Sequence, residues 1–233
     1  MKTSEIPAAL RGISSMATRR LLADLARAWG TVGGVALQIE SVGGVEAARR
    51  VVAGEAFDLI FLASDALERL DASGHLLPGS RVDLARSGVV VAVAAGAPLP
   101  RLDSAATLRE AVRAAPSVGV STGPSGAALT QLFARWGLLD EIQPRLVTAP
   151  PGTPVGELVA RGEVSLGFQQ RAELIHLEGL TLADLPPDAQ ITTVFGGAMA
   201  RHSPHAALGR EVLAFMAAPG TAEAKRRQGM DAA

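Results

Sequence analysis

The chain has 233 residues, of which 48% are hydrophobic and 19% are charged, and its formal net charge is -1. This length and apolar content suffice for one large domain or two small ones. The near-neutral charge gives no overall basic character of the kind common in nucleic-acid-binding domains, so we expect no nucleic-acid partner. Cysteine is absent, which excludes disulfides, thiolate metal ligands and thiol nucleophiles.

Histidines and apolar runs give no sign of a metal site or a membrane segment. His202 and His205 are three residues apart, but Pro204 lies between them and no carboxylate is nearby. We therefore predict no metal and no cofactor. The N-terminus lacks the apolar stretch of a secretory signal, and no later segment approaches the roughly eighteen apolar residues of a membrane helix. We expect a cytoplasmic protein without membrane insertion, or a periplasmic one if an export signal has been removed.

Strand-like and helical patterns alternate along the whole chain. The segments expected to form strands are residues 8–13, 35–41, 57–64, 88–96, 117–121, 145–149, 164–170 and 190–201. The segments expected to form helices are residues 17–29, 45–55, 65–74, 107–115, 126–137, 154–162 and 206–219. Strands that alternate with helices of about ten residues predict an α/β architecture with mainly parallel sheets.

Four strand-to-helix junctions share one chemistry, in which hydroxyl side chains stand beside the start of a helix. In open α/β sheets, ligands gather outside the C-terminal ends of the strands. Hydroxyls and the free N–H groups of a helix N-terminus suit a small anion, and glycines let the backbone come close to it. The candidate ligand-binding residues of these junctions are Ser14, Ser15, Gly43, Gly44, Ser64, Ser121, Thr122, Gly123, Ser125 and Gly126.

A structural role for the same residues stays open, because serine and threonine are preferred N-caps of any helix. The loop STGPSG, residues 121–126, is the strongest candidate for binding, since its two glycines, its proline and its three hydroxyl residues exceed what capping requires. Two glutamines, Gln169 and Gln170, end a later strand. They either point amide donors at a ligand or face solvent and cap a helix, and the sequence does not decide which of them contacts a ligand.

These junctions resemble those of the type II periplasmic binding protein superfamily, and within it the molybdate-binding protein branch. Members of the branch typically have Ser-Leu after the first strand, a Gly-Gly-Ser loop before the second helix and Ala-Asp-Val-Phe-Ile-Ser-Ala-Asp around the third strand. The counterparts here are SSM, SVGGVEAARRVVAGE and FDLIFLASD. Two departures are present: Gly44 or Val45 replaces the serine of the Gly-Gly-Ser loop, and the chain has no tyrosine, a residue common in the late strand of the branch.

The resemblance implies a two-lobed periplasmic binding protein-like fold (type II), in which each lobe is a mainly parallel sheet flanked by helices and the ligand cleft lies between the lobes. Lobe 1 would comprise residues 1–84 plus 193–233, and lobe 2 the inserted residues 85–192. The implied function is a substrate-binding protein that holds a small anion, either an oxyanion or a di- or tricarboxylate, and closes about a hinge. The implied partner is an ABC transporter permease.

A second resemblance connects STGPSG, GFQQRAEL and LPPDAQITTVF with a subgroup of the same branch that is related to aconitate isomerase. That enzyme interconverts cis- and trans-aconitate, which requires a base near a substrate carbon and donors for the developing charge. In this enzymatic alternative the candidate catalytic residues are Glu173 and Asp65. Anion binding is the leading hypothesis, because the loops support binding directly whereas the sequence places no base.

Overall fold

The computed structural model describes residues 7–233. Residues 1–6, which belong to the expected lobe 1, lie outside the described part. The chain divides into two compact units, of which unit 1 is Met1–Arg86 with Val194–Ala233 and unit 2 is Ser87–Thr193. Within residues 7–233, no helix is both long and apolar enough to cross a lipid bilayer.

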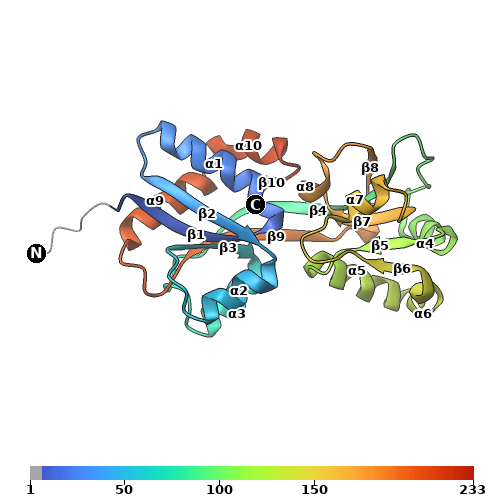
Figure 1. Cartoon of the computed structure of the whole chain (residues 1–233), viewed down its shortest axis with the longest axis horizontal. Helices are drawn as coiled ribbons and strands as arrows, with labels where there is room; N and C mark the ends of the chain where they lie inside the picture. Colours follow the sequence, from blue (N-terminus) through green and yellow to red (C-terminus); the bar gives the residue numbers. More distant parts are fainter. Residues whose placement is uncertain (1–6) are drawn as a thin grey trace, which may run out of the picture. The chain divides into compact units, whose positions relative to one another are not determined.

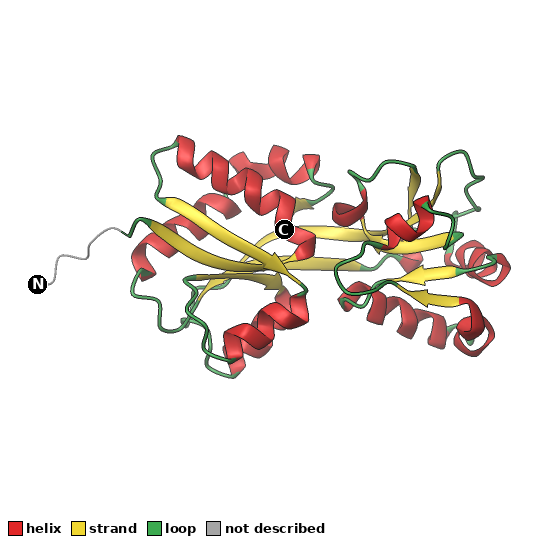
Figure 2. Ribbon diagram, viewed as in Figure 1, coloured by secondary structure: helices red, strands yellow, loops and turns green. Residues whose placement is uncertain are grey.

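Unit 1 is a sheet covered by helices on both faces (Figures 1 and 2). Strands β1, β2 and β3 are parallel, with β1 in the middle, and β9 lies antiparallel to β3. Two strands, β4 and β9, extend beyond the residues of unit 1. The elements are β1 (Ala9–Ser15), α1 (Arg19–Thr31), β2 (Ala36–Val42), α2 (Gly44–Val52), β3 (Leu59–Ala63), α3 (Ser64–Ala72), β4 (Val82–Ala94), β9 (Thr192–Met199), α9 (Ala206–Ala217), α10 (Ala222–Arg227) and β10 (Asp231–Ala232).

The core of unit 1 lies on both faces of this sheet. On one face, Val51 of α2 and Leu67 of α3 belong to the same buried cluster as Ile13 of β1. On the other face, the chain packs so closely that a Cβ built on Gly197 would meet Leu213 Cδ2 at 2.6 Å. Helices on both faces explain why the strands carry near-continuous apolar runs.

Unit 2 is a second sheet with its own flanking helices. Strand β5 is parallel to β6 and β7, whereas β7 and β8 both pair antiparallel with β4. The elements, besides β4, are α4 (Ala105–Ala114), β5 (Val118–Val120), α5 (Pro124–Arg135), α6 (Leu139–Ile142), β6 (Leu146–Thr148), α7 (Val155–Ala160), β7 (Leu166–Gln170), α8 (Arg171–Leu174) and β8 (Leu180–Asp184).

The alternation of side chains along β4 divides the core of unit 2 into two clusters. Val89 and Val91 pack with the residues of α4 and α5, whereas Val90 and Ala92 pack with those of α7. Because both sets are buried, the strand reads as a continuous apolar run rather than as an alternating one.

Some boundaries and elements differ from those expected. Helix α4 begins at Ala105, two residues before the expected start, because Ser104 and Thr107 form a capping box. Helix α5 begins at Pro124 rather than at residue 126, since proline is well suited to a first helical turn. Strand β8 and the short helix α6 were not expected. β8 is only half-buried, so its sequence lacks the strong apolar signal of the inner strands.

Candidate functional site

The C-terminal ends of β1 and β2 bring serine hydroxyls together in unit 1. The parallel register pairs Ser14 with Ser41 and Ser15 with Val42. The Oγ atoms of Ser14 and Ser41 lie 2.7 Å apart and share a hydrogen bond. Ser41 stands in the same junction loop as Gly43 and Gly44, and its pairing with Ser14 follows from the register of the two parallel strands.

Helical segments begin at the ends of all three parallel strands, and their first turns lack side-chain caps. The segments start at Met16, Gly44 and Ser64, and the N-cap residues before them make no side-chain capping hydrogen bond. Most other helices of residues 7–233 also lack a side-chain cap, and α4, with the capping box described above, is the exception. Capping therefore does not account for the hydroxyls at these three ends. The N–H groups of the first turns are free to bind water or an anion.

Gly44 places the start of α2 beside Ser15. A Cβ built on Gly44 would lie 3.7 Å from the Cβ of Ser15, an ordinary van der Waals contact. Ser15 is buried, and its Oγ lies 3.5 Å from the hydroxyl of Thr18. Because Gly43 and Gly44 carry no side chains, they leave the first turn of α2 uncovered next to this serine.

The hydroxyl of Ser64, at the end of β3, already has an acceptor. Ser64 Oγ donates to Asp83 Oδ1 at 2.9 Å. The neighbouring Asp65, a candidate base, has a side chain that is 57% exposed and is paired with Arg69 at 3.0 Å. An exposed carboxylate that is already paired with an arginine at the surface is not in the desolvated setting typical of a catalytic base.

In unit 2, the loop STGPSG runs from the end of β5 into α5. The Oγ atoms of Ser121 and Ser125 lie 3.4 Å apart, and Ser125 is buried. The N-cap of α5, Gly123, makes no side-chain capping bond, and Thr122 is exposed. A Cβ on Gly126 would lie 1.8 Å from the carbonyl oxygen of Ser121, so the path of this loop requires glycine there.

The structure distinguishes the two glutamines at the end of β7. The backbone N–H of Val155 donates to Gln169 Oε1 at 2.6 Å, and Gln169 Nε2 donates to Glu173 Oε2 at 2.7 Å. Gln170 Nε2 donates to Thr193 Oγ1 at 2.7 Å, whereas Gln170 Oε1 is buried and has no hydrogen-bond partner within residues 7–233. Both ends of the Gln169 amide are therefore used inside unit 2, and Gln170 keeps a spare acceptor.

Glu173 has an unusual environment for a carboxyl group. Burial raises its pKa from 4.5 to about 7, although the hydrogen bond from Gln169 acts in the opposite direction. A carboxyl group that is half-ionised near neutral pH can both accept and return a proton. The sequence identified Glu173 as a candidate base, but it gave no indication of the contact with Gln169. Across residues 7–233, no cluster of histidine and acidic side chains could hold a metal ion.

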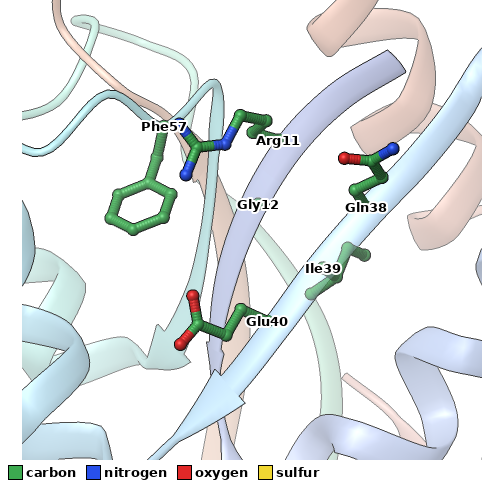
Figure 3. A pocket seen from close by; sticks show the side chains of 6 residues that line it. All are labelled: Arg11, Gly12, Gln38, Ile39, Glu40 and Phe57. Atoms are coloured by element: carbon green, nitrogen blue, oxygen red, sulfur yellow. The ribbon is translucent and has the colours of Figure 1, made fainter.

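A polar hollow of about 320 Å³ lies elsewhere in unit 1, over β1 and β2 (Figure 3). Arg11 stands over the ring of Phe57, with 5.6 Å between the guanidinium carbon and the ring centroid. The residues that line the hollow are Arg11, Gly12, Gln38, Ile39, Glu40 and Phe57.

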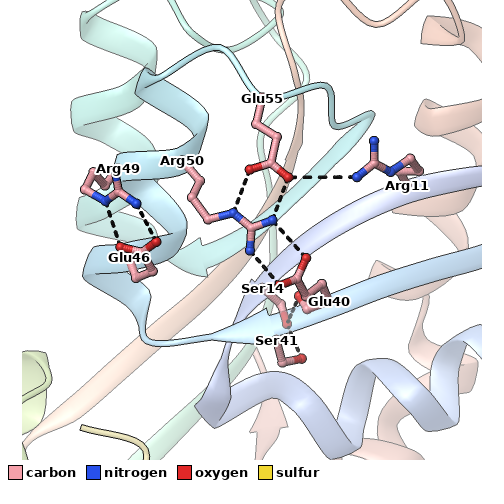
Figure 4. A network of polar contacts seen from close by, with 8 residues as sticks. All are labelled: Arg11, Ser14, Glu40, Ser41, Glu46, Arg49, Arg50 and Glu55. Carbon is pink, nitrogen blue, oxygen red and sulfur yellow. Dashed lines mark hydrogen bonds and ion pairs between the residues drawn. The ribbon is translucent and has the colours of Figure 1, made fainter.

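Beside this hollow, Arg50 is held between two carboxylates (Figure 4). Its guanidinium lies 2.6 Å from Glu40 and 2.6 Å from Glu55, and Arg11 is 3.9 Å from Glu55. The hydrogen bonds from Arg50 hold the pKa of both carboxyl groups below the ordinary value. These arginines are therefore charge-balanced by acids of the same unit, and the sequence gave no indication of this network.

Two comparisons relate the sequence of this chain to known proteins. Residues 10–231 match the model of a family described as bacterial extracellular solute-binding protein. An aconitate isomerase from a Pseudomonas species is 35% identical over 182 residues, which cover 78% of this chain and 70% of that protein.

Solved structures share the fold. The periplasmic molybdate-binding protein of Azotobacter vinelandii superposes with a TM-score of 0.77 at 24% identity, over 95% of this chain and 98% of that one. The tungstate ABC transporter structure from Geobacter sulfurreducens gives 0.70 at 18% identity, over 93% and 97%. The expected type II periplasmic-binding-protein fold is thus confirmed. The expected cytoplasmic location has no support, since the matching family is described as extracellular.

Proposed function

Because the chain belongs to the family of bacterial extracellular solute-binding proteins, we propose that it binds a small anion that carries carboxylate groups. The observation that carries this proposal is the set of helical segments at Met16, Gly44 and Ser64, which begin without side-chain caps at the ends of three adjacent parallel strands. Backbone N–H groups at such positions, with serine hydroxyls beside them, bind anions well. For a role in uptake, the partner that we propose is an ABC transporter permease.

A carboxylate is favoured over molybdate for two reasons. The loop that contains Gly43 and Gly44 lacks the serine of the molybdate-binding pattern, and the chain has no tyrosine. The relative with 35% identity is named as an isomerase of aconitate, whose charged groups are carboxylates. In unit 2, the hydroxyl pair of Ser121 and Ser125 gives neutral donors of the kind that a carboxylate accepts from.

Calorimetric titration with cis-aconitate, trans-aconitate, citrate, molybdate, tungstate and sulfate tests the proposal. We expect Ser121→Ala combined with Ser125→Ala to weaken carboxylate binding at least tenfold, because a hydrogen bond to a charged group contributes about 1.5–3 kcal/mol. The matched control is Ser117→Ala with Ser165→Ala, a second serine pair, which stands just before β5 and β7 at their N-terminal ends. Unchanged affinity in the Ser121→Ala, Ser125→Ala variant would show that this loop does not contact the ligand. Tight binding of molybdate alone would refute the proposal that the ligand is a carboxylate.

A second candidate function is isomerisation of an unsaturated acid, and the environment of Glu173 favours it. In such a reaction the Glu173 carboxylate would remove a proton from a carbon next to a substrate carboxylate. The electron pair would shift along the allylic unit, and the proton would return at the other carbon. A carboxyl group with a pKa of about 7 suits both steps, since it is neither too weak a base nor too weak an acid.

Proton NMR of each aconitate isomer, followed over time with the protein present, tests this second function. We expect Glu173→Gln to abolish interconversion while aconitate binding is retained. Glu178→Gln, an exposed change four residues beyond the end of α8, is the matched control and should stay active. Conversion by the Glu173→Gln variant would refute the role of this carboxyl group.

A further inference from the structure

The side chain of Gln169 connects two parts of unit 2. It is buried, with 3% of its surface exposed. Its oxygen accepts the N–H of Val155, the first residue of α7, and its nitrogen donates to Glu173 on α8. An amide with its two ends fixed in this way has a defined rotation. The atom that faces Glu173 must therefore be the donor, because the other end already accepts a backbone N–H.

The two oxygens of Glu173 differ as a result. Oε2 accepts the hydrogen bond from Gln169. Within residues 7–233, Oε1 makes no hydrogen bond. The buried side-chain atoms that lack a hydrogen-bond partner there are Arg109 Nε and Gln170 Oε1, and Glu173 Oε1 is not one of them. Solvent therefore reaches Oε1. Of the two oxygens, Oε1 is the one available to a ligand.

Neighbouring charged groups do not explain the raised pKa of Glu173. Arg171, the basic residue of α8, pairs with Asp184 at 2.5 Å. Burial and the Gln169 hydrogen bond are the causes of the shift in the pKa of Glu173, and no neighbouring charge is among them. Among the groups of residues 7–233 that act on this pKa, the hydrogen bond from Gln169 is thus the one that favours the ionised carboxylate.

We propose that Gln169 is a positioning residue for Glu173: its amide, anchored at the other end by the N–H of Val155 in α7, holds Oε2 and leaves Oε1 as the oxygen that exchanges a proton with a bound unsaturated acid. The role in proton exchange rests on the second candidate function. The positioning itself does not, because it can be measured without a ligand. In this proposal Gln169 supports Glu173, whereas Gln170 keeps a buried Oε1 that has no hydrogen-bond partner within residues 7–233.

The test follows the carboxyl signal of Glu173 by carbon NMR in protein labelled with ¹³C-glutamate, with the signal assigned from its loss in Glu173→Gln. Gln169→Met has a similar volume and no donor, so the ionised carboxylate loses its hydrogen bond. We expect the pKa of Glu173 to rise by about one to two units, since a hydrogen bond to a charged group is worth about 1.5–3 kcal/mol and one unit is 1.36 kcal/mol. The control Gln143→Met makes the same change at an exposed position of unit 2 and should leave this pKa unchanged.

A measurement on the unmodified protein covers the case in which Gln169→Met does not fold. If Gln169 donates to Glu173, the chemical shifts of its side-chain amide protons must change with pH, and the midpoint of that change must equal the pKa of the Glu173 carboxyl group. A pKa that stays the same or falls in Gln169→Met, or amide protons that do not follow the carboxyl, would overturn the positioning role. Absence of aconitate conversion, by contrast, would overturn only the isomerase function and the role of Oε1 in it.

Discussion

From the raised pKa of Glu173 we predict how the unfolding free energy of the protein depends on pH. The pKa of this carboxyl group is 4.5 in an ordinary environment, as in the unfolded chain, and about 7 in the folded protein. Between these values the folded state keeps a proton that the unfolded state has lost, so the unfolding free energy falls as the pH rises through this window. At 1.36 kcal/mol per unit, the full effect is about 3 kcal/mol.

Urea unfolding of the wild type and of Glu173→Gln, followed by circular dichroism from about pH 5 to about pH 8, measures this effect. The glutamine cannot ionise, so we expect the unfolding free energy of the wild type to fall by about 2–3 kcal/mol relative to that of the variant across this range. The matched control Glu178→Gln should follow the wild type. A difference in unfolding free energy between the wild type and Glu173→Gln that stays constant at all pH values would refute the raised pKa of this partly buried carboxyl group.

Three further predictions separate structural from binding roles. Gly126→Ala should destabilise the protein by about 1–3 kcal/mol, because the new Cβ would overlap the carbonyl of Ser121. Gly123→Ala should be tolerated, because its Cβ would lie 3.7 Å from Ser121 Oγ. Equal melting temperatures of the two variants would contradict this reasoning. Ser104→Ala should cost about 1 kcal/mol of stability through loss of the α4 cap and leave ligand affinity unchanged in titrations. Ser15→Ala should do the reverse, with weaker ligand binding and a nearly unchanged melting temperature.

Local patterns in the sequence were sufficient to predict the inner strands and the helices that follow them. The apolar run around Val89 to Val93 predicts a strand buried on both faces, and β4 has this form. Strand β8 was missed, because a half-buried strand has no such run. The cap at Ser104 was missed as well, since Thr107 in place of a glutamate or glutamine gives a less familiar capping box.

The sequence predicted which types of side chain form the candidate site, but not which groups those side chains contact. Glu173 follows the strand-ending glutamines in the sequence, yet its pKa depends on burial that only the folded chain determines. Gln169 is satisfied by Val155, which lies fourteen residues earlier, and Ser64 by Asp83, which lies nineteen residues later. Such contacts arise when helices pack on the sheet, and no local pattern encodes them.

The pairing of Arg50 with Glu40 and Glu55 has a consequence for how ligand affinity should respond to ionic strength. In this network the basic side chains face acids of the same unit, and the donors at the strand ends are serine hydroxyls and backbone N–H groups. Mobile ions screen exposed charges over about 8 Å at physiological salt, but they weaken hydrogen bonds from neutral donors far less. Capture of an anion at these strand ends would therefore persist across a wide range of salt concentrations.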